Sequence, residues 1–152
     1  MRRVIPLTLA ALVALPLASL APAEEAAPFV TKSSPHDVTT TLDRIAAAVE
    51  ANGGKVFVRL DHAGAAEEYD ESLRPTQVLI FGNPKVGTGL MDKNPLLAID
   101  LPLKVMAYEG EDGTVVVYRN TETWALDHGL QKLADGAGGQ LDKLTDRAIA
   151  PE

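Results

Sequence analysis

Residues 34–60 read SPHDVTTTLDRIAAAVEANGGKVFVRL and contain a complete helix-to-strand unit. Apolar side chains recur at spacings of four, three and four, which predicts one buried face of an amphipathic helix: Val38, Leu42, Ile45 and Val49. We expect Ser34 to cap the first turn and Asp37 to favour its positive end. Asn52-Gly53-Gly54 should end the helix, because glycine readily adopts the left-handed conformation found there. Lys55–Leu60 then follows as a strand.

Outward from this unit, apolar runs predict four more strands, and helical periodicity predicts further helices. The strands are Phe29–Lys32, Thr76–Phe81, Ile99–Glu109 and Thr114–Tyr118. The helices are Ala63–Leu73 with an acidic surface, Leu90–Leu97, a segment capped by Asn120, and a short one over Leu141–Ala148. Gly82–Gly89 is predicted to be a loop. The order β-α-β-α-β-β-β-α indicates the α+β class.

The first three strands are separated by helices, and a strand-helix-strand unit usually forms a right-handed crossover with parallel strands. Their carboxyl ends would then share one edge of the sheet, where ligand sites are common in open α/β sheets. That edge would carry Ser34–Asp37, Asp61-His62 and Asn83–Thr88. The second helix is short, which leaves an antiparallel arrangement open.

Composition narrows the functional classes. The chain has 152 residues, 46% hydrophobic and 23% charged, which fits a single globular domain. It contains no cysteine, which excludes disulfides, thiolate metal sites and cysteine nucleophiles. Lys and Arg number 14 against 21 Asp and Glu, giving a formal net charge of −7. An acidic domain repels phosphate backbones, so we expect no nucleic-acid partner.

The N-terminus has the pattern of a Sec-type signal peptide. A cationic start, Met1-Arg2-Arg3, precedes the apolar run Val4–Leu20 and the small-x-small sequence Ala21-Pro22-Ala23. The alternative is a retained membrane anchor, but about 17 residues interrupted by proline fall short of the about 20 that a spanning helix needs. We therefore expect residues 1–23 to be cleaved, a domain over 24–130, a C-terminal extension with a short helix over 131–152, and a periplasmic or secreted protein without stable membrane insertion.

Several motifs occur together in one order along the chain: Thr41-Leu42, Asp61-His62, Arg74-Pro75-Thr76-Gln77, Phe81–Thr88 and Ile99–Leu103. In these motifs the sequence resembles the bacterial and archaeal family known as domain of unknown function 302. The resemblance implies one curved sheet backed by helices, in a homodimer. We expect this single curved sheet to be mixed and to contain about five strands. It implies no activity, because none is assigned to the family.

The glycine-rich segment Gly82–Gly89 invites comparison with phosphate-binding loops. It lacks the Gly-Lys-Ser/Thr ending of a Walker loop and the three spaced glycines of a dinucleotide fold, so no nucleotide cofactor is expected. One interpretation is a tight turn in which Asn83 bonds to the backbone. The other is a cradle for a small anion or polar ligand, formed by loop amides and these side chains: Asn83, Lys85, Gly87 and Thr88.

Asp61-His62 is the best acid–base candidate, since a carboxylate can orient or charge a neighbouring imidazole. The competing interpretation makes Asp61 the N-cap of the following helix. His36 could approach His62 at the same edge. The three histidines show no metal-ligand spacing, so no metal is expected, and a serine nucleophile elbow is missing.

Taken together, the sequence predicts an exported small-ligand-binding or interaction module that acts as a homodimer. The alternative is a small hydrolase or isomerase that uses Asp61-His62 for proton transfer.

Overall fold

The computed structural model describes residues 27–151, with the backbone alone for residues 126 and 131–138. The expected signal peptide, residues 1–23, lies outside the described residues. The strands are β1 (Phe29–Ser34), β2 (Lys55–Asp61), β3 (Thr76–Gly82), β4 (Leu103–Gly110) and β5 (Gly113–Arg119). The helices are α1 (Val38–Ala51), α2 (His62–Glu67), α3 (Pro84–Met91), the 3₁₀ helix η1 (Pro95–Ile99), α4 (Thr121–Asp127) and α5 (Gln131–Ala148).

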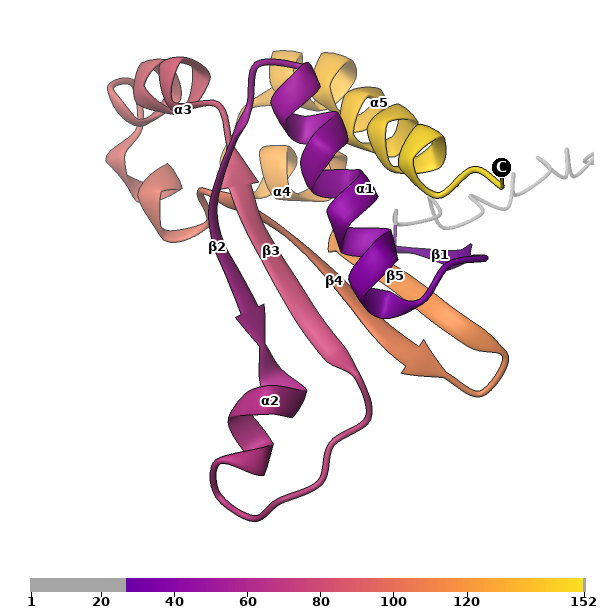
Figure 1. Cartoon of the computed structure of the whole chain (residues 1–152). Helices are drawn as coiled ribbons and strands as arrows, with labels where there is room; N and C mark the ends of the chain where they lie inside the picture. Colours follow the sequence, from indigo (N-terminus) through magenta and orange to yellow (C-terminus); the bar gives the residue numbers. More distant parts are fainter. Residues whose placement is uncertain (1–26, 152) are drawn as a thin grey trace, which may run out of the picture.

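The strands form one open five-stranded sheet in the order β1-β5-β4-β3-β2 (Figure 1). This confirms the α+β class, the single sheet and the packing by helices. Every neighbouring pair is antiparallel, so the expectation of a mixed sheet is wrong, and of the first three strands only β1 and β2 run in the same direction. The reason lies in α2, whose six residues are too few for a crossover, so the chain returns in β3 as the antiparallel neighbour of β2.

This topology separates one of the three segments that we expected at one edge of the sheet from the other two. β1 and β2 run in the same direction at opposite edges of the sheet, and β3 runs against them. Ser34–Asp37 and Asp61-His62 therefore lie at one end of the sheet. Asn83–Thr88 lies at the other end, beside the start of β2, since Gly82 pairs with Lys55.

The hydrophobic core lies between the sheet and a layer formed by α1 and α5 (Figure 1). The predicted stripe of α1 is confirmed, because Val38, Leu42, Ile45 and Val49 are all buried. They pack on alternate residues of the three central strands: Leu79, Phe81, Val105, Ala107, Val116 and Tyr118. α5 adds Leu141 and Ala148 to the same core.

The ends of α1 differ in how well the sequence predicted them. The N-cap is Asp37, which accepts the Thr40 N–H at 2.7 Å, and Ser34 is the last residue of β1. Ser34 is buried, and its hydroxyl forms a hydrogen bond with the hydroxyl of Thr41, which connects the end of β1 to the first turns of α1. At the C-terminus, Gly53 has φ +75°, as the left-handed prediction requires.

Three helices have unexpected limits. α2 ends at Glu67, although the helix was predicted to continue to Leu73. None of its residues is buried, so no packing against the rest of the protein stabilises further helical turns. The helix predicted over Leu90–Leu97 is split, because Pro95 begins the separate 3₁₀ helix. α5 has 18 residues and begins at Gln131, ten residues before the start of the short helix predicted over Leu141–Ala148.

Long-range polar contacts hold α5 in place. Lys32 of β1 donates to the Asp142 carbonyl at 2.9 Å and pairs with the Asp146 carboxylate at 2.6 Å. Arg44 of α1 donates to the Ala148 carbonyl at 2.6 Å, close to the helix C-terminus. Among residues 27–151, the helices fall short of the length and apolar character that a membrane span requires.

Candidate ligand-binding cleft

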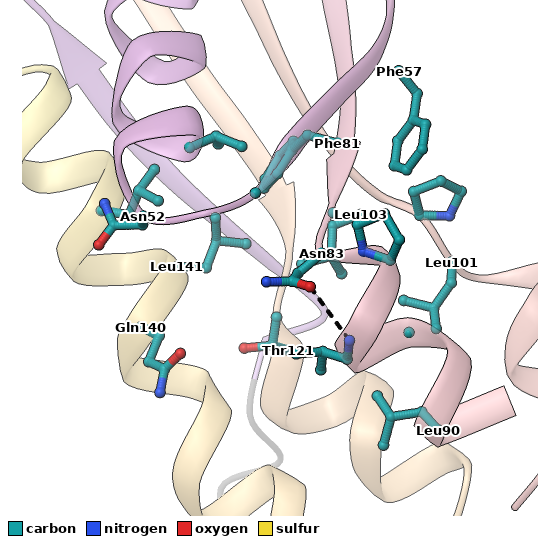
Figure 2. A pocket seen from close by; sticks show the side chains of 18 of the residues that line it. Asn52, Phe57, Phe81, Asn83, Leu90, Leu101, Leu103, Thr121, Gln140 and Leu141 are labelled. Atoms are coloured by element: carbon teal, nitrogen blue, oxygen red, sulfur yellow. Dashed lines mark hydrogen bonds between the residues drawn. The ribbon is translucent and has the colours of Figure 1, made fainter. Parts of the chain in front are cut away.

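A cleft of about 1130 Å³ opens between the C-terminus of α1, the end of β3, α3 and α5 (Figure 2). Its floor and walls are largely apolar, with Phe81 and Leu103 from the sheet, Leu90 from α3 and Leu141 from α5. Phe57 of β2 stands at its side with 43% of its surface exposed. A concave apolar surface of this size is typical of sites for small organic ligands.

Asn83 and its neighbours form the N-terminus of α3, so the loop predicted over Gly82–Gly89 is wrong. The Asn83 Oδ1 accepts the N–H groups of Lys85 at 3.0 Å and Val86 at 3.4 Å, and Pro84 occupies the first turn. A helix N-cap followed by proline explains this outcome. The Asn83 amide also donates to the Gly53 carbonyl at 3.1 Å, which joins α3 to the end of α1.

These contacts show which of the residues predicted to cradle an anion line the cleft. Asn83, Gly87 and Thr88 line the cleft, whereas Lys85 is exposed and lies outside its lining. Because Asn83 occupies the Lys85 and Val86 amides, they are not presented to a ligand. The segment therefore contributes a wall to the cleft.

Asp61 and His62 lie at the opposite end of the sheet from the cleft and are both exposed. One Asp61 oxygen accepts the Gly64 N–H at 3.0 Å, and the other accepts the Gln77 side-chain amide at 3.2 Å. Asp61 is thus the N-cap of α2, as the competing interpretation held. This arrangement lends the acid–base alternative no geometric support.

His36 lies in the segment between β1 and α1. Its ring Nε2 donates to the Ala150 carbonyl at 3.3 Å. His36 thus ties the start of α1 to the residues after α5. Within residues 27–151, no group of three or more His, Asp or Glu side chains is placed to hold a metal ion.

The sequence reasoning missed the contribution of α5 to the cleft. Gln140, Leu144 and Arg147 recur at helical spacing and line the cleft together with Lys143. Lys143 and Arg147 are exposed, and neither forms a salt bridge with another described residue. The cleft therefore combines an apolar interior with two cations at its margin. The spacing is present in the sequence, but the predicted helix began only at Leu141, because Gly136, Gly138 and Gly139 disfavour a helix.

A polar network joins the ends of η1, β5 and α4 beside the cleft. The Asp100 carboxylate is 2.6 Å from His128 Nε2 and 2.8 Å from Arg119 Nη1, and Arg119 also pairs with Asp127 at 2.6 Å. The hydrogen bond with His128 and the charge of Arg119 hold the pKa of Asp100 below its ordinary value despite partial desolvation. The ring of His128 meets Trp124 edge to face, and Trp124 lines the cleft.

The network predicts a specific loss of stability in acid. The pKa of Asp100 is lower in the folded state than in the unfolded state. Its contribution to the free energy of unfolding is therefore complete above about pH 4 and disappears as the pH falls through the folded pKa. Asp100→Asn should therefore lower the free energy of unfolding by about 1 kcal/mol at neutral pH and make its decline between about pH 5 and pH 2 shallower.

Urea unfolding across this pH range measures both effects. Glu68→Gln replaces an exposed carboxylate on another part of the surface and should leave the decline of the free energy of unfolding in acid unchanged. If the free energy of unfolding of Asp100→Asn declined between about pH 5 and pH 2 as steeply as that of the unaltered chain, the role of the network would be contradicted.

Comparison with known proteins agrees with this fold. The sequence model of DUF302, "Domain of unknown function DUF302", matches residues 30–148, and the match extends past Leu130 through α5. A crystal structure titled "uncharacterized conserved protein DUF302 from Bacillus stearothermophilus" superimposes with a TM-score of 0.73 at 19% identity. It covers 81% of this chain and 99% of that one, which shows the shared fold.

Two curated relatives carry the name "Fluoride-specific ion channel FluC 1", from Brucella suis and Brucella abortus. Each is 39% identical over 109 residues, which is 71% of this chain. The chain spans 43% and 40% of their respective lengths, so their name describes proteins more than twice as long as the aligned segment. By its match over residues 30–148, the chain belongs to the DUF302 family of domains of unknown function.

Proposed function

We propose that the chain is an exported binding module whose cleft takes an amphipathic anion, a molecule with an apolar body and one acidic group. The observation that carries this proposal is a largely apolar cleft with two cations at its margin that have no carboxylate partner among the described residues. The N-terminal pattern supports export, which makes the ligand a molecule of the periplasm or the medium.

The apolar interior supports an apolar ligand body. Phe57, Leu90 and Leu144 line the cleft, and each keeps part of its side chain exposed. Covering apolar surface releases about 25 cal/mol for each Å² removed from water, so this interior favours hydrocarbon or aromatic groups over sugars or inorganic ions.

The margin supports an acidic head group. Lys143 and Arg147 are one helical turn apart and lie on the same side of α5. The chain as a whole carries a net charge of −7, so a pair of unneutralised cations beside an apolar cleft is a local exception. An anion at this margin would gain charge-assisted hydrogen bonds without displacing an existing partner.

Fluoride is a weaker candidate for this cleft. Fluoride has no apolar surface to bury, and the cleft offers mostly carbon atoms. The name of the Brucella relatives belongs to chains of which this one spans about two fifths. Sodium fluoride therefore serves as the negative control for binding.

Two fluorescent probes test the proposal in the chain lacking residues 1–23. Anilinonaphthalene sulfonate is aromatic and anionic, and N-phenyl-1-naphthylamine is its neutral counterpart. Both should bind, and fluoride should not compete with either. Lys143→Glu with Arg147→Glu should weaken binding of the sulfonate by about tenfold, because two attractions become repulsions, and should leave the neutral probe nearly unchanged.

The matched control is Lys93→Glu, an exposed cation outside the cleft, which should leave both affinities unchanged. Equal loss of both probes in the α5 double variant would show that the cations do not select charge. Failure of both probes to bind the unaltered chain would contradict the cleft as a ligand site.

A further inference from the structure

The core face of the sheet ends in a polar row, at the end of the sheet opposite the cleft. Ser34 of β1, Thr114 of β5 and Glu109 of β4 lie side by side in the strand register. The neighbouring row contains the buried Val116 and Ala107, so the apolar core stops one row short of the strand ends. A second cavity, of about 500 Å³, lies between the polar row and the segment that joins β1 to α1. Its volume is in the range of sites for small ligands.

Thr114 brings to this cavity a hydroxyl that has no partner. Thr114 lines the cavity, and only 7% of its surface is exposed. Within the part of the chain that the structure describes, its hydroxyl forms no hydrogen bond. The hydroxyl of Ser34 in the same row, by contrast, bonds to that of Thr41. Because nearly buried polar groups are normally hydrogen-bonded, the Thr114 hydroxyl is left for a molecule that enters the cavity.

Three carboxylates line the same cavity. Asp37 precedes α1, Glu109 lies near the end of β4, and Asp112 lies in the turn between β4 and β5. All three are exposed, and none forms a salt bridge with another described residue. The Arg74 guanidinium donates to the main-chain carbonyl of Glu109 at 3.4 Å, not to its carboxylate. The ring of His36, which also lines the cavity, is bonded to a main-chain carbonyl. The cavity therefore presents unneutralised negative charge.

The separation of the carboxylates indicates an elongated organic cation. They belong to different segments, and within residues 27–151 no three acidic or imidazole groups are placed to hold one metal ion. Ammonium groups along a carbon chain carry several N–H donors each and meet carboxylates at different positions. We propose that this cavity binds a linear diamine or polyamine, with ammonium groups on Glu109 and Asp112 and an N–H donated to the hydroxyl of Thr114. The site is separate from the cleft and takes a ligand of opposite charge.

Isothermal titration calorimetry on the chain lacking residues 1–23 tests the site, with spermidine as the probe and 1,4-butanediol as an uncharged control. Spermidine should bind, and the diol should not. Glu109→Gln and Asp112→Asn should each weaken spermidine binding by about threefold, because each removes one attraction at an exposed position. Asp37 stays unchanged in these variants, because it caps α1.

Thr114→Val separates a binding role from a structural one. It should weaken spermidine binding by about threefold, because one hydrogen bond is lost. It should leave the free energy of unfolding unchanged or higher, because the hydroxyl that it removes has no protein partner. Urea unfolding of the same variant measures the second effect.

The matched control for charge is Glu111→Gln, which removes an exposed carboxylate in the same turn but outside the cavity. Its affinity for spermidine should equal that of the unaltered chain. Equal losses in Glu111→Gln and Asp112→Asn would show diffuse attraction to an acidic surface and overturn the proposal. So would an unchanged affinity in Thr114→Val, or an unaltered chain that does not bind spermidine.

Discussion

Replacing Gly87 by phenylalanine is expected to weaken probe binding to the cleft by about tenfold or more. Gly87 lines the cleft from α3, and a Cβ atom added there meets only the Met91 methyl carbon, 3.9 Å away. The new ring would occupy volume that the ligand needs, and a tenfold loss corresponds to about 1.4 kcal/mol. The backbone at Gly87 is helical, so the substitution should preserve or raise helix stability.

The matched control lies two residues along the same helix. Gly89 has no atom within 4 Å of an added Cβ and does not line the cleft. Gly89→Phe should bind N-phenyl-1-naphthylamine as the unaltered chain does. Fluorescence titration of the three proteins gives the comparison, and equal affinities for Gly87→Phe and the unaltered chain would place the probe elsewhere.

Ile45→Ala should lower the free energy of unfolding by about 2–5 kcal/mol, the largest stability effect we expect from a single substitution. Ile45 is fully buried where α1 packs on the central strands. Removing its outer carbons loses their transfer free energy and leaves a cavity that a rigid sheet cannot close. Urea unfolding followed by circular dichroism, at one fixed protein concentration, measures the change.

Glu50→Ala provides the reference on the same helix, because Glu50 is exposed. Its effect should stay within about 0.5 kcal/mol. If the two substitutions cost the same, α1 does not pack on the sheet as described, and the floor of the cleft loses its support.

The parts of the fold that were predictable are those set by local chemistry. Val38, Leu42, Ile45 and Val49 repeat at helical spacing, and that repeat identifies both the helix and its buried face. Gly53 marks the helix end, because its left-handed backbone is costly for other residues. The direction of β3 could not be predicted from local sequence, because it depends on whether the helix after β2 is long enough to form a crossover.

The cleft was only partly predictable, because its walls come from segments distant in sequence. Asn83, Gly87 and Thr88 were singled out, yet their role is to cap and form a helix beside the cleft. Lys143 and Arg147 were overlooked, since nothing local shows that α5 lies against the end of α1. Asp61 was also singled out, as an acid–base candidate, but its carboxylate accepts a backbone N–H as the N-cap of α2.

An NMR titration of the isotope-labelled chain lacking residues 1–23 with anilinonaphthalene sulfonate tests the ligand-binding proposal most directly. The account predicts that backbone amide shifts concentrate on the cleft walls, at Thr88 of α3 and at Leu144 and Arg147 of α5, while Val117 on the opposite face of the sheet stays unchanged. Shifts centred on Val117, or on Asp61 and His62, with the cleft unaffected, would contradict it.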